Sequence, residues 1–358
     1  MPPWGGQSPQ GQPGGPAPWG PQQQWPPPQR GGRGKWIWGG LALLVVIALS
    51  VTVTVLVLRP DSGGTVSPTP QNGDSEFASA GDDGPVNIIA EDPTCEAWGK
   101  VIRDYSDEQK AVNWGGRDRS IAASAWTPEQ RRMYDEVGKA TTNAAHLTIN
   151  LSKATPHRVM RELYEQFIAY AGAFVDAIPT YVPENDNLSN ATNAIGTGLA
   201  QICSAIDYKS ATVIAPLVPK PAPPSEASSS TDLTAPPQRF LTQENPVCSE
   251  WSSLTVKFND DTAAWRELDP RIPASEWTPE QKSINDDVKS TISTNADDLE
   301  RLGRRSDNAT LEDIAVLAAQ YQRALVIALP AYTQPDNFLS EAATFLVKSV
   351  DWACKAAG

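Results

Sequence analysis

The stretch WGGRDRSIAASAWTPEQ at residues 114–130 returns as WRELDPRIPASEWTPEQ at residues 265–281. The two segments share the pattern W-x3-D-x2-I-x-A-S-x-W-T-P-E-Q and are offset by 151 residues. A shared segment this long and irregular indicates a duplicated domain, since self-similarity at a fixed period marks repeated structural units. The sequence therefore predicts two copies of one domain, at residues 93–206 and 246–358.

The end of the shared stretch has the features of a helix start. Thr127 suits the capping position, Pro128 the first helical position, and Gln130 the third position of a capping box. Glu129 adds a negative charge near the positive end of the helix dipole. Residues 278–281 repeat all four features, so we expect a long helix to begin here in each copy.

Apolar residues recur at helical spacing after each of these starts. Stripes this wide need a partner surface, so we expect a small antiparallel bundle of about four helices in each copy, with Pro179 and Pro330 ending the third. No alternating strand pattern competes with the helices. The predicted fold class is all-α, with one transmembrane helix and two tandem bundle domains, each closed by one disulfide. The stripes of the first copy are formed by Met133, Val137, Ala140, Ala144, Leu147 and Leu151, then Val159, Leu163, Phe167, Tyr170, Phe174 and Ile178, then Leu188, Ala191, Ile195, Leu199 and Ile202.

The four cysteines lie one near each end of each copy, which allows three pairings. A unit that once stood alone must have closed on itself, so we predict Cys95 with Cys203 and Cys248 with Cys354. Free thiols or a metal site are the competing interpretation. An even cysteine count agrees with an oxidising compartment outside the cytoplasm.

The amino-terminal part contains the membrane signal. Residues 1–35 are expected to be a disordered cytoplasmic tail, because Pro, Gly and Gln dominate and no apolar run offsets the entropy of folding. Residues 36–58 carry no charge, and at ~1.5 Å per residue they are long enough for a hydrocarbon core of ~30 Å. We therefore predict a single transmembrane helix. Arg30, Arg33 and Lys35 favour a cytoplasmic amino terminus, which places the remainder outside.

Small residues in the predicted membrane helix suggest weak self-association. Ala48 and Thr52, like Ser50 and Thr54, lie four residues apart on one helix face. Small side chains at this spacing let two membrane helices approach closely. A weak homodimer through this helix is therefore one expectation, beside a helix that serves only as an anchor.

Charge and composition limit the partners of the outer part. The net charge is −13, and residues 1–59 contain four cations and no acid, which leaves −17 for the rest. Binding to a phosphate backbone needs Lys/Arg patches, so nucleic acid is excluded as a partner. Residues 59–92 and 207–245, rich in Pro, Gly, Ser and Asp, are predicted as linkers that hold the domains away from the membrane and from each other.

The sequence offers no catalytic constellation. His146 and His157 are replaced by Asp and Asn at the aligned positions, which excludes a shared histidine-based site. No metal-ligand spacing, nucleophile elbow or phosphate-binding glycine loop occurs, so we predict no metal and no cofactor. Asp118 and Asp269 lie inside the shared stretch, but one acid per copy without a partner is a poor basis for acid–base catalysis. We expect each to accept hydrogen bonds within its own loop.

The aromatic residues of the shared stretch have two interpretations. They either plug the end of each bundle or line a groove suited to a glycan or a lipid acyl chain. The candidate ligand or partner contacts are Trp114, Asp118, Trp126, Trp265, Asp269 and Trp277.

The layout resembles the actinobacterial, mycobacterial-type, proline-rich conserved membrane proteins. The tail from Met1-Pro2-Pro3-Trp4 to Pro26-Pro27-Pro28, the single span Trp36–Leu58 and an acidic ectodomain with paired cysteines carry this resemblance. It implies a cell-envelope location and no particular activity. No functional residue can be transferred from it.

We predict a membrane-anchored extracytoplasmic binding or adaptor protein of the bacterial cell envelope, with a glycan, lipid or protein partner. Two weak sites on one linker would gain effective concentration. The rivals are an envelope enzyme acting on a cell-wall or lipid substrate through Asp118 or Asp269, and a purely structural spacer or assembly protein. A cavity lined by the shared tryptophans favours binding, convergent carboxylates favour catalysis, and an exposed apolar face favours a protein partner.

Overall fold

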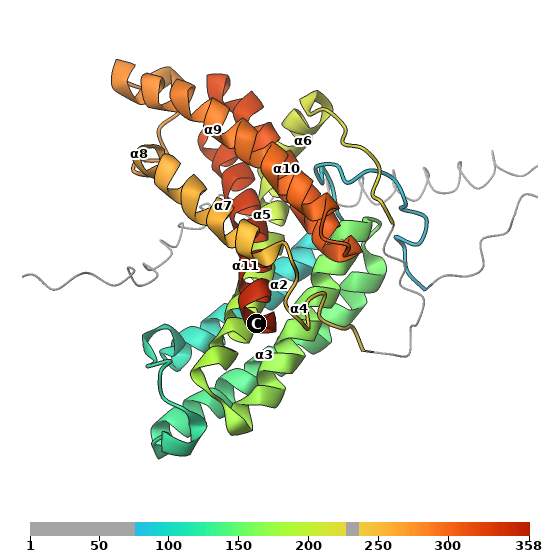
Figure 1. The fold of residues 1–358 in the computed structure, drawn as a ribbon, viewed down its shortest axis with the longest axis vertical. Helices are drawn as coiled ribbons and strands as arrows, with labels where there is room; N and C mark the ends of the chain where they lie inside the picture. Colours follow the sequence, from blue (N-terminus) through green and yellow to red (C-terminus); the bar gives the residue numbers. More distant parts are fainter. Residues whose placement is uncertain (1–75, 227–235) are drawn as a thin grey trace, which may run out of the picture. The chain divides into compact units, whose positions relative to one another are not determined.

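The computed structural model describes residues 76–226 and 236–358. The predicted tail at 1–35, the predicted membrane helix at 36–58 with its pairing residues, and the start of the first linker lie outside the described residues. Every regular element in the described ranges is helical, so the all-α prediction is confirmed for this part of the chain (Figure 1).

In the described ranges, eight long or medium helices make up the body, four in each half. The first half contains α2 (Cys95–Ala111), α3 (Pro128–Ala154), α4 (Arg158–Ala177) and α5 (Asp186–Asp207). The second half contains α7 (Cys248–Asp261), α9 (Pro279–Arg304), α10 (Ala309–Ala328) and α11 (Asn337–Ala357). The short helices α6 (Ser210–Ile214) and α8 (Ala263–Arg266) lie between them in the chain.

The predicted helix starts are present in both halves. The Thr127 hydroxyl accepts a hydrogen bond from the Gln130 backbone N–H at 3.2 Å, and the Gln130 side chain accepts one from the Thr127 N–H at 2.9 Å. Thr278 and Gln281 make the same reciprocal pair at the start of α9. This capping box satisfies two backbone donors that a helix start otherwise leaves unpaired.

Proline ends the third helix of each half as predicted. The α-helical bonding of α4 stops at Ala177, and the 3-10 turn Ile178–Thr180 contains Pro179. Helix α10 stops at Ala328 before the turn Leu329–Ala331, which contains Pro330. Proline lacks the N–H that the next helical hydrogen bond requires.

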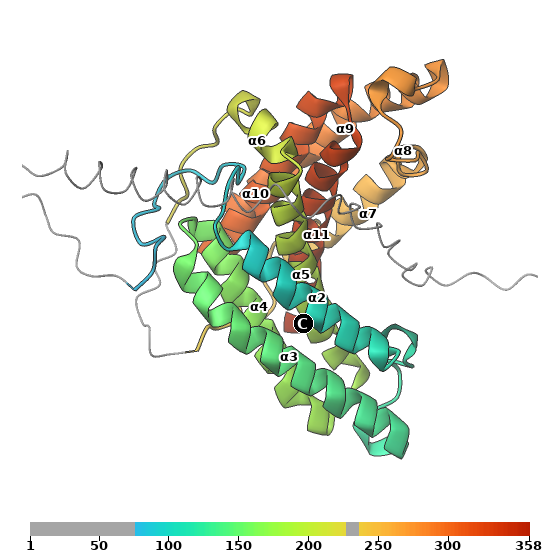
Figure 2. The same cartoon turned by 180° about the vertical axis from the view of Figure 1, so that it is seen from behind.

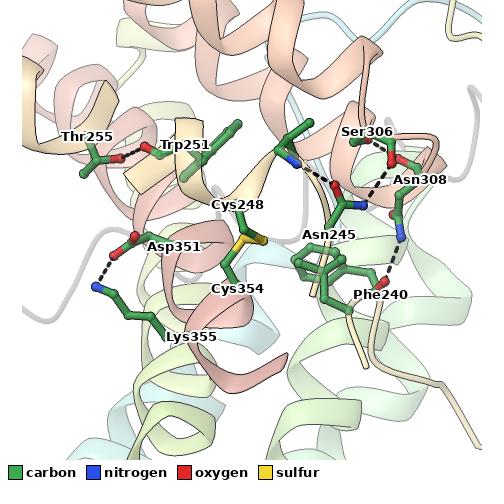
Figure 3. Close-up of a disulfide and its surroundings, with 12 residues drawn as sticks. Phe240, Asn245, Cys248, Trp251, Thr255, Ser306, Asn308, Asp351, Cys354 and Lys355 are labelled. Carbon is green, nitrogen blue, oxygen red and sulfur yellow. Dashed lines mark hydrogen bonds and ion pairs between the residues drawn. A yellow bond between two sulfur atoms is a disulfide. The ribbon is translucent and has the colours of Figure 1, made fainter. Parts of the chain in front are cut away.

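Two disulfides close the halves with the predicted pairing. Cys95 joins Cys203 with their Cα atoms 5.2 Å apart. Cys248 joins Cys354 with their Cα atoms 5.5 Å apart, and this second disulfide is drawn in Figure 3. Each bond ties the first helix of its half to the last. The pairing inferred from the duplicated sequence is confirmed.

The two halves pack against each other through α5 and α11, which lie side by side (Figures 1 and 2). The helices are antiparallel, since Asn187 at the start of α5 donates to the Lys355 carbonyl at 3.1 Å, while Tyr208 after α5 stacks on Phe338 at 5.0 Å. Gly198 of α5 and Phe345 of α11 lie at this contact, since a β-carbon on Gly198 would be in ordinary van der Waals contact with the Phe345 Cβ, at 3.6 Å. The described residues, 76–226 and 236–358, belong to one compact unit.

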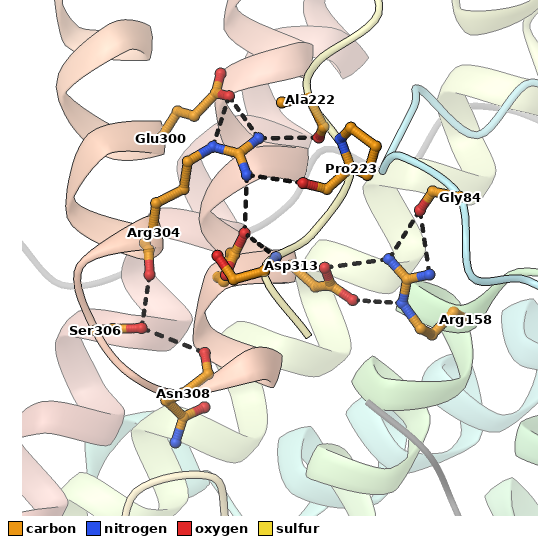
Figure 4. Close-up of polar contacts among 12 residues, drawn as sticks. Gly84, Arg158, Ala222, Pro223, Glu300, Arg304, Ser306, Asn308 and Asp313 are labelled. Atoms are coloured by element: carbon orange, nitrogen blue, oxygen red, sulfur yellow. Dashed lines mark hydrogen bonds and ion pairs between the residues drawn. The ribbon is translucent and has the colours of Figure 1, made fainter. Parts of the chain in front are cut away.

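A buried ion pair also joins the halves. Arg158 at the start of α4 donates through Nε to Asp313 of α10 at 2.7 Å, and both side chains are at most 3% exposed (Figure 4). The same guanidinium donates to the carbonyls of Asp82 at 2.6 Å and Gly84 at 3.2 Å. Its donors are thus shared between α10 and the segment that precedes α2.

The second linker does not hold the two halves apart, which corrects that part of the sequence prediction. Residues 210–214 form α6, and the following segment is held on the second half. Arg304 donates to the carbonyls of Ala222 at 3.0 Å and Pro223 at 3.1 Å (Figure 4). A proline-rich segment forms no internal backbone hydrogen bonds, so these carbonyls are available as acceptors. The linker boundaries themselves stay a prediction.

Helix α10 is apolar and long enough to cross a membrane by length and composition, and it is the one such helix in the described ranges. Some 72% of its most apolar window is buried inside the unit. Its charged Asp313 pairs with Arg158 across the halves. We therefore interpret α10 as the core helix of the second half.

Candidate functional site

The first shared tryptophan of the first half is part of the core. Trp114 is 3% exposed, and its ring meets the edge of Tyr134 at 4.8 Å and Phe174 at 6.0 Å between centroids. The Arg117 guanidinium lies over the indole, 3.6 Å from its centroid. Arg117 also forms an ion pair with Asp186, and both side chains are under 10% exposed. Rings and a paired charge fill this end of the bundle.

Trp126 locks the loop onto the same cluster. Its indole stacks on Tyr134 with centroids 3.9 Å apart, and its Nε1–H donates to the Ile121 carbonyl at 2.9 Å. The Ala123 N–H donates to the Tyr181 carbonyl at 2.9 Å. The irregular first part of the shared stretch, before the capping box, therefore supplies backbone hydrogen-bond partners to the buried residues Trp126 and Tyr181.

The second half repeats these contacts. The Trp277 Nε1–H donates to the Ile272 carbonyl at 3.0 Å, and the Ala274 N–H donates to the Tyr332 carbonyl at 2.8 Å. The Tyr332 hydroxyl donates to the Pro270 carbonyl at 2.8 Å, as the Tyr181 hydroxyl does to the Arg119 carbonyl at 3.1 Å. Trp277 and Tyr332 stack at 5.8 Å. These loop contacts of the second Trp and the Tyr, which we call the aromatic frame, are thus the same in both halves.

The two carboxylates of the shared stretch are used within their own loops. Asp118 accepts from the Ser120 N–H at 2.9 Å and from its hydroxyl at 2.6 Å, and these bonds lower the pKa of Asp118. Asp269 accepts from the N–H and the guanidinium of Arg271, which lowers the pKa of Asp269 to about 2. The structure does not bring Asp118 and Asp269 to a common site.

The second half contains a cavity of about 410 Å³ inside this frame. It lies between α7, α8, α9, α10 and α11, and Asn259 and Arg266 in its lining are exposed, so it opens to the surface there. Among the predicted contact residues, Trp265, Asp269 and Trp277 line it. The other lining residues used below are Phe258, Asn285, Ile292, Asn295, Gln322, Leu325, Tyr332, Glu341 and Lys348.

The cavity exists because rings of the first half are absent from the second. Asn285 is at the position aligned with Tyr134, and Leu325 at the position aligned with Phe174. Tyr134 and Phe174 are fully buried in the first half. Asn285 accepts from Trp265 Nε1 at 3.0 Å, so it lies at the same tryptophan but occupies less space. Shorter side chains within an unchanged frame leave the space open.

Polar groups converge on the apolar walls of the cavity. Asn295 of α9 is 5% exposed, and its Nδ2 donates to Gln322 Oε1 at 3.0 Å. Its Oδ1 accepts no hydrogen bond from the described residues. A buried acceptor without a donor costs free energy, so this oxygen lowers the stability of the cavity wall.

Two charged side chains of α11 also line the cavity. Burial raises the pKa of Glu341 above its ordinary value, and the nearby Lys348 partly offsets this. Burial likewise lowers the pKa of Lys348. Partly desolvated charges of opposite sign in one cavity are typical of functional sites.

The sequence prediction missed most of these residues. Asn285, Asn295, Glu341 and Lys348 lie on α9 and α11, outside the shared stretch. Their signal is the difference between aligned positions of the two halves, such as Asn285 for Tyr134. Within the described ranges, no group of three or more His, Cys, Asp or Glu side chains is placed to hold a metal. His157 contacts the Glu91 carbonyl at 2.8 Å, and His146 is exposed.

The model of the mycobacterial ESX-1 associated protein family matches residues 77–358, which is most of the chain. The chain belongs to this family. The mycobacterial resemblance is thereby confirmed for the helical part, while the proline-rich tail and the predicted membrane span precede the matched residues.

The ESX-1 associated chain is also similar to an uncharacterized protein of Mycolicibacterium smegmatis (strain MKD8). The two are 42% identical over 349 residues, which cover 94% of this chain and 91% of the relative. No solved structure matches the chain.

The two aligned tryptophans should differ in their effect on stability. Trp114 is buried among rings, so Trp114→Ala removes packed surface and leaves a void. Trp265 is half-buried beside open space. We expect Trp114→Ala to lower the free energy of unfolding by about 2 kcal/mol more than Trp265→Ala. Urea unfolding of both variants measures the difference, and equal losses would contradict the contrast between a closed and an open half.

Glu341 should make stability depend on pH. Because the folded state raises its pKa, the folded state binds more protons than the unfolded state from about pH 4.5 upward. Its contribution to stability is therefore full below that pH and is lost as the pH rises through the folded pKa. We expect Glu341→Gln to gain stability relative to the parent chain between pH 4 and pH 7, measured by urea unfolding at each pH. A difference that stays constant with pH would contradict this.

Proposed function

We infer that this protein is a membrane-anchored binding or adaptor protein of the mycobacterial envelope, whose binding site is the cavity of the second half. The observation that carries this proposal is the cavity itself, lined by the shared residues Trp265 and Trp277 and by an unpartnered buried acceptor. Apolar walls with a few convergent polar groups are typical of ligand sites. Membership in the ESX-1 associated family suggests a secretion-related role with protein partners.

The location follows from sequence arguments. The uncharged segment 36–58 and the cations before it support a single-pass anchor with residues 59–358 outside. The two disulfides agree with an oxidising compartment. A weak homodimer through the anchor stays part of the proposal.

We propose that the two similar halves have different roles, whereas the sequence suggested two equivalent weak binding sites. The shared contacts of Trp126 and Trp277 support the origin of the two halves from one unit. We propose that the first half, with its rings packed, is the rigid support on which α11 and the cavity are built through α5. Two equal sites acting by effective concentration are not part of this proposal.

Binding is favoured over catalysis by the surroundings of the carboxylates. Asp118 and Asp269 are each bonded within their own loop, and Glu341 is the one further carboxylate that lines the cavity. A general acid or base would need a reacting partner within hydrogen-bond reach. We therefore propose that the protein is not an enzyme.

A structural assembly role is the second candidate. Tyr208, Val213 and Leu217, around α6, are 58–65% exposed. Exposed apolar side chains close together in the chain favour a protein contact. This surface is separate from the cavity residues, so the two roles can be tested independently.

A variant that narrows the cavity tests the binding function in mycobacterial cells. Leu325→Phe places in the second half the ring that Phe174 supplies in the first. Leu147→Phe adds the same ring to α3 and is the matched control, because Leu147, which the sequence placed in the apolar stripe, is 44% exposed. Quantitative mass spectrometry of envelope components that co-purify with the full-length chain should show the loss of at least one component with Leu325→Phe and none with Leu147→Phe. Identical recovery from both variants would contradict binding at the part of the cavity that Leu325 lines.

A further inference from the structure

A cation is built into one end of the first half. The Arg117 guanidinium lies over the Trp114 indole, 3.6 Å from its centroid, and forms an ion pair with Asp186 of α5. Arg119 adds a second cation, 3.6 Å from the same carboxylate. Asn190, one turn along α5, donates to this carboxylate at 3.1 Å. A flat cation, an indole and a carboxylate of the last helix therefore form one cluster in this half.

The second half keeps the indole and lacks these cations. Trp265 is at the position of the first-half tryptophan. The positions of the two arginines are taken by Leu268 and Pro270. All three residues line the cavity of the second half. No cation from the aligned positions therefore enters this cavity.

The second half also has a carboxylate on its last helix, one turn further along. On α11, Asn337 is at the position of the paired aspartate, and Glu341 is at that of Asn190, which touches this aspartate in the first half. Glu341 lines the cavity, and none of the described residues donates a hydrogen bond to its carboxylate. Lys348 offsets its charge only in part, since the two lie seven residues or about 10.5 Å apart along the helix. The cavity lining thus contains an indole and a carboxylate without the guanidinium that joins them in the first half.

The surroundings of Glu341 are negative. Burial raises the pKa of Tyr332, and the charges of three carboxylates raise it further, those of Asp336, Glu341 and Asp269. Asp336 accepts a backbone N–H of the turn before α11 at 2.7 Å. Asp269 is held by Arg271 within its own loop. Glu341 is therefore the carboxylate at this end of the cavity that is left for a positively charged ligand.

The cavity has room for a cation and for the alkyl chain that carries it. A protein cavity of ~150 Å³ holds one benzene molecule, and this one measures about 410 Å³. Leu254 and Phe258 of α7 line it, and apolar walls suit the methylene groups of a long cationic side chain. The exposed Asn259 and Arg266 mark where the rest of such a ligand reaches the surface.

We propose that the cavity of the second half binds a guanidinium group, which stacks on Trp265 and pairs with Glu341. The ligand supplies from outside the cation that Arg117 supplies in the first half. A guanidinium is flat, so it stacks on an aromatic ring and bonds a carboxylate through two N–H groups, whereas an ammonium acts as a point charge. This proposal rests on the proposed function, because it names the ligand class of the same cavity. An arginine side chain of a partner protein and a free guanidinium compound share this chemistry.

Three capped amino acids separate the charge of the ligand from its shape. Binding of the Nα-acetyl methylamides of arginine, citrulline and lysine to the full-length chain is measured by ligand-observed NMR titration. Citrulline has the shape of arginine without the charge, and lysine has the charge without the flat group. We expect the arginine probe to bind about tenfold more tightly than the citrulline probe and about threefold more tightly than the lysine probe.

Two pairs of variants test the residues of the site. Glu341→Gln should remove the preference for arginine over citrulline. Glu267→Gln is its control and should leave the preference unchanged, because Glu267 is exposed and does not line the cavity. Leu268→Arg gives the second half a cation of its own and should abolish binding of the arginine probe, whereas Leu268→Met should retain it. Circular dichroism checks that each variant keeps its helical content.

The outcomes decide between this proposal and the general binding function. Equal binding of the arginine probe with the citrulline or the lysine probe overturns the requirement for a guanidinium. An unchanged preference over citrulline in Glu341→Gln overturns the role of Glu341. Absence of binding by all three probes overturns the proposal, while the co-purification experiment still tests the proposed function. Given binding of the arginine probe, ethylguanidinium that binds at least as tightly identifies a free guanidinium compound as the source, and weaker binding identifies an arginine side chain of a partner.

Discussion

Replacing Arg158 by alanine should lower the free energy of unfolding by about 3–5 kcal/mol, because it leaves the Asp313 carboxylate buried without its partner. Asp313 is fully buried and bonded to the guanidinium at 2.7 Å. The same change removes the donors to the Asp82 and Gly84 carbonyls. Urea unfolding followed by circular dichroism measures the loss.

A double substitution separates the charge from the packing. Arg158→Met with Asp313→Leu removes this pair and keeps apolar volume at both positions, so part of the lost stability should return, while the buried Glu162, 3.9 Å from Arg158, still loses this cation. A loss below about 1 kcal/mol in Arg158→Ala would show that the halves do not depend on this ion pair. Equal losses in the single and double variants would show that packing, rather than the unpaired charge, is responsible.

Removing the Cys95–Cys203 disulfide should cost about 4 kcal/mol, since it closes a segment of 108 residues and so restricts the unfolded chain. The Cys248–Cys354 bond closes 106 residues and should contribute a similar amount to global stability. Urea unfolding of the two double serine variants measures both costs. Losses below about 1 kcal/mol would contradict this role.

The two disulfides should differ in what they hold locally. Helix α2 buries Val101 and Tyr105 beyond its cysteine, whereas the buried residues of α7 are Cys248 and Trp251 at its start. Without its disulfide, α7 has little buried surface to retain it. Hydrogen exchange should therefore rise along α7 when Cys248 and Cys354 are replaced by serine. Exchange along α2 should rise less when Cys95 and Cys203 are replaced.

The sequence predicted those parts of the fold that depend on a few neighbouring residues or on the similarity of residues 114–130 to residues 265–281. The capping boxes at Thr127 and Thr278 need only four consecutive residues, and Pro179 and Pro330 cannot continue the hydrogen bonding of the helix that precedes them. The disulfide pairing was predicted from the hypothesis that each of the two similar segments closes on itself. None of these depends on how the two halves meet.

The contacts between the halves could not be predicted in this way. Arg158 and Asp313 lie 155 residues apart and are not aligned positions of the repeat, so neither local spacing nor the duplication relates them. The pairing of α5 with α11 brings together residues such as Gly198 and Phe345, and no local pattern relates these two positions.

The candidate site was predicted only in part because a cavity is made by side chains that are missing. The shared stretch is equally well formed in both halves, and Trp126 and Trp277 make the same bond to an isoleucine carbonyl. The difference arises just after it, where Tyr134 is replaced by Asn285, and further along at Leu325. Comparing aligned positions by side-chain volume, rather than by similarity, finds such a site.

The stability of Leu325→Phe tests most directly the central claim, that the second half keeps an aromatic frame with its ring left out. Leu325 lines the cavity, so the added ring enters open space, and urea unfolding should give an unchanged or higher free energy of unfolding. Leu317→Phe makes the same change on α10 at a fully buried position that does not line the cavity, and overpacking there should cost about 1–3 kcal/mol. A loss of more than about 1 kcal/mol in Leu325→Phe, similar to that of Leu317→Phe, would contradict the account.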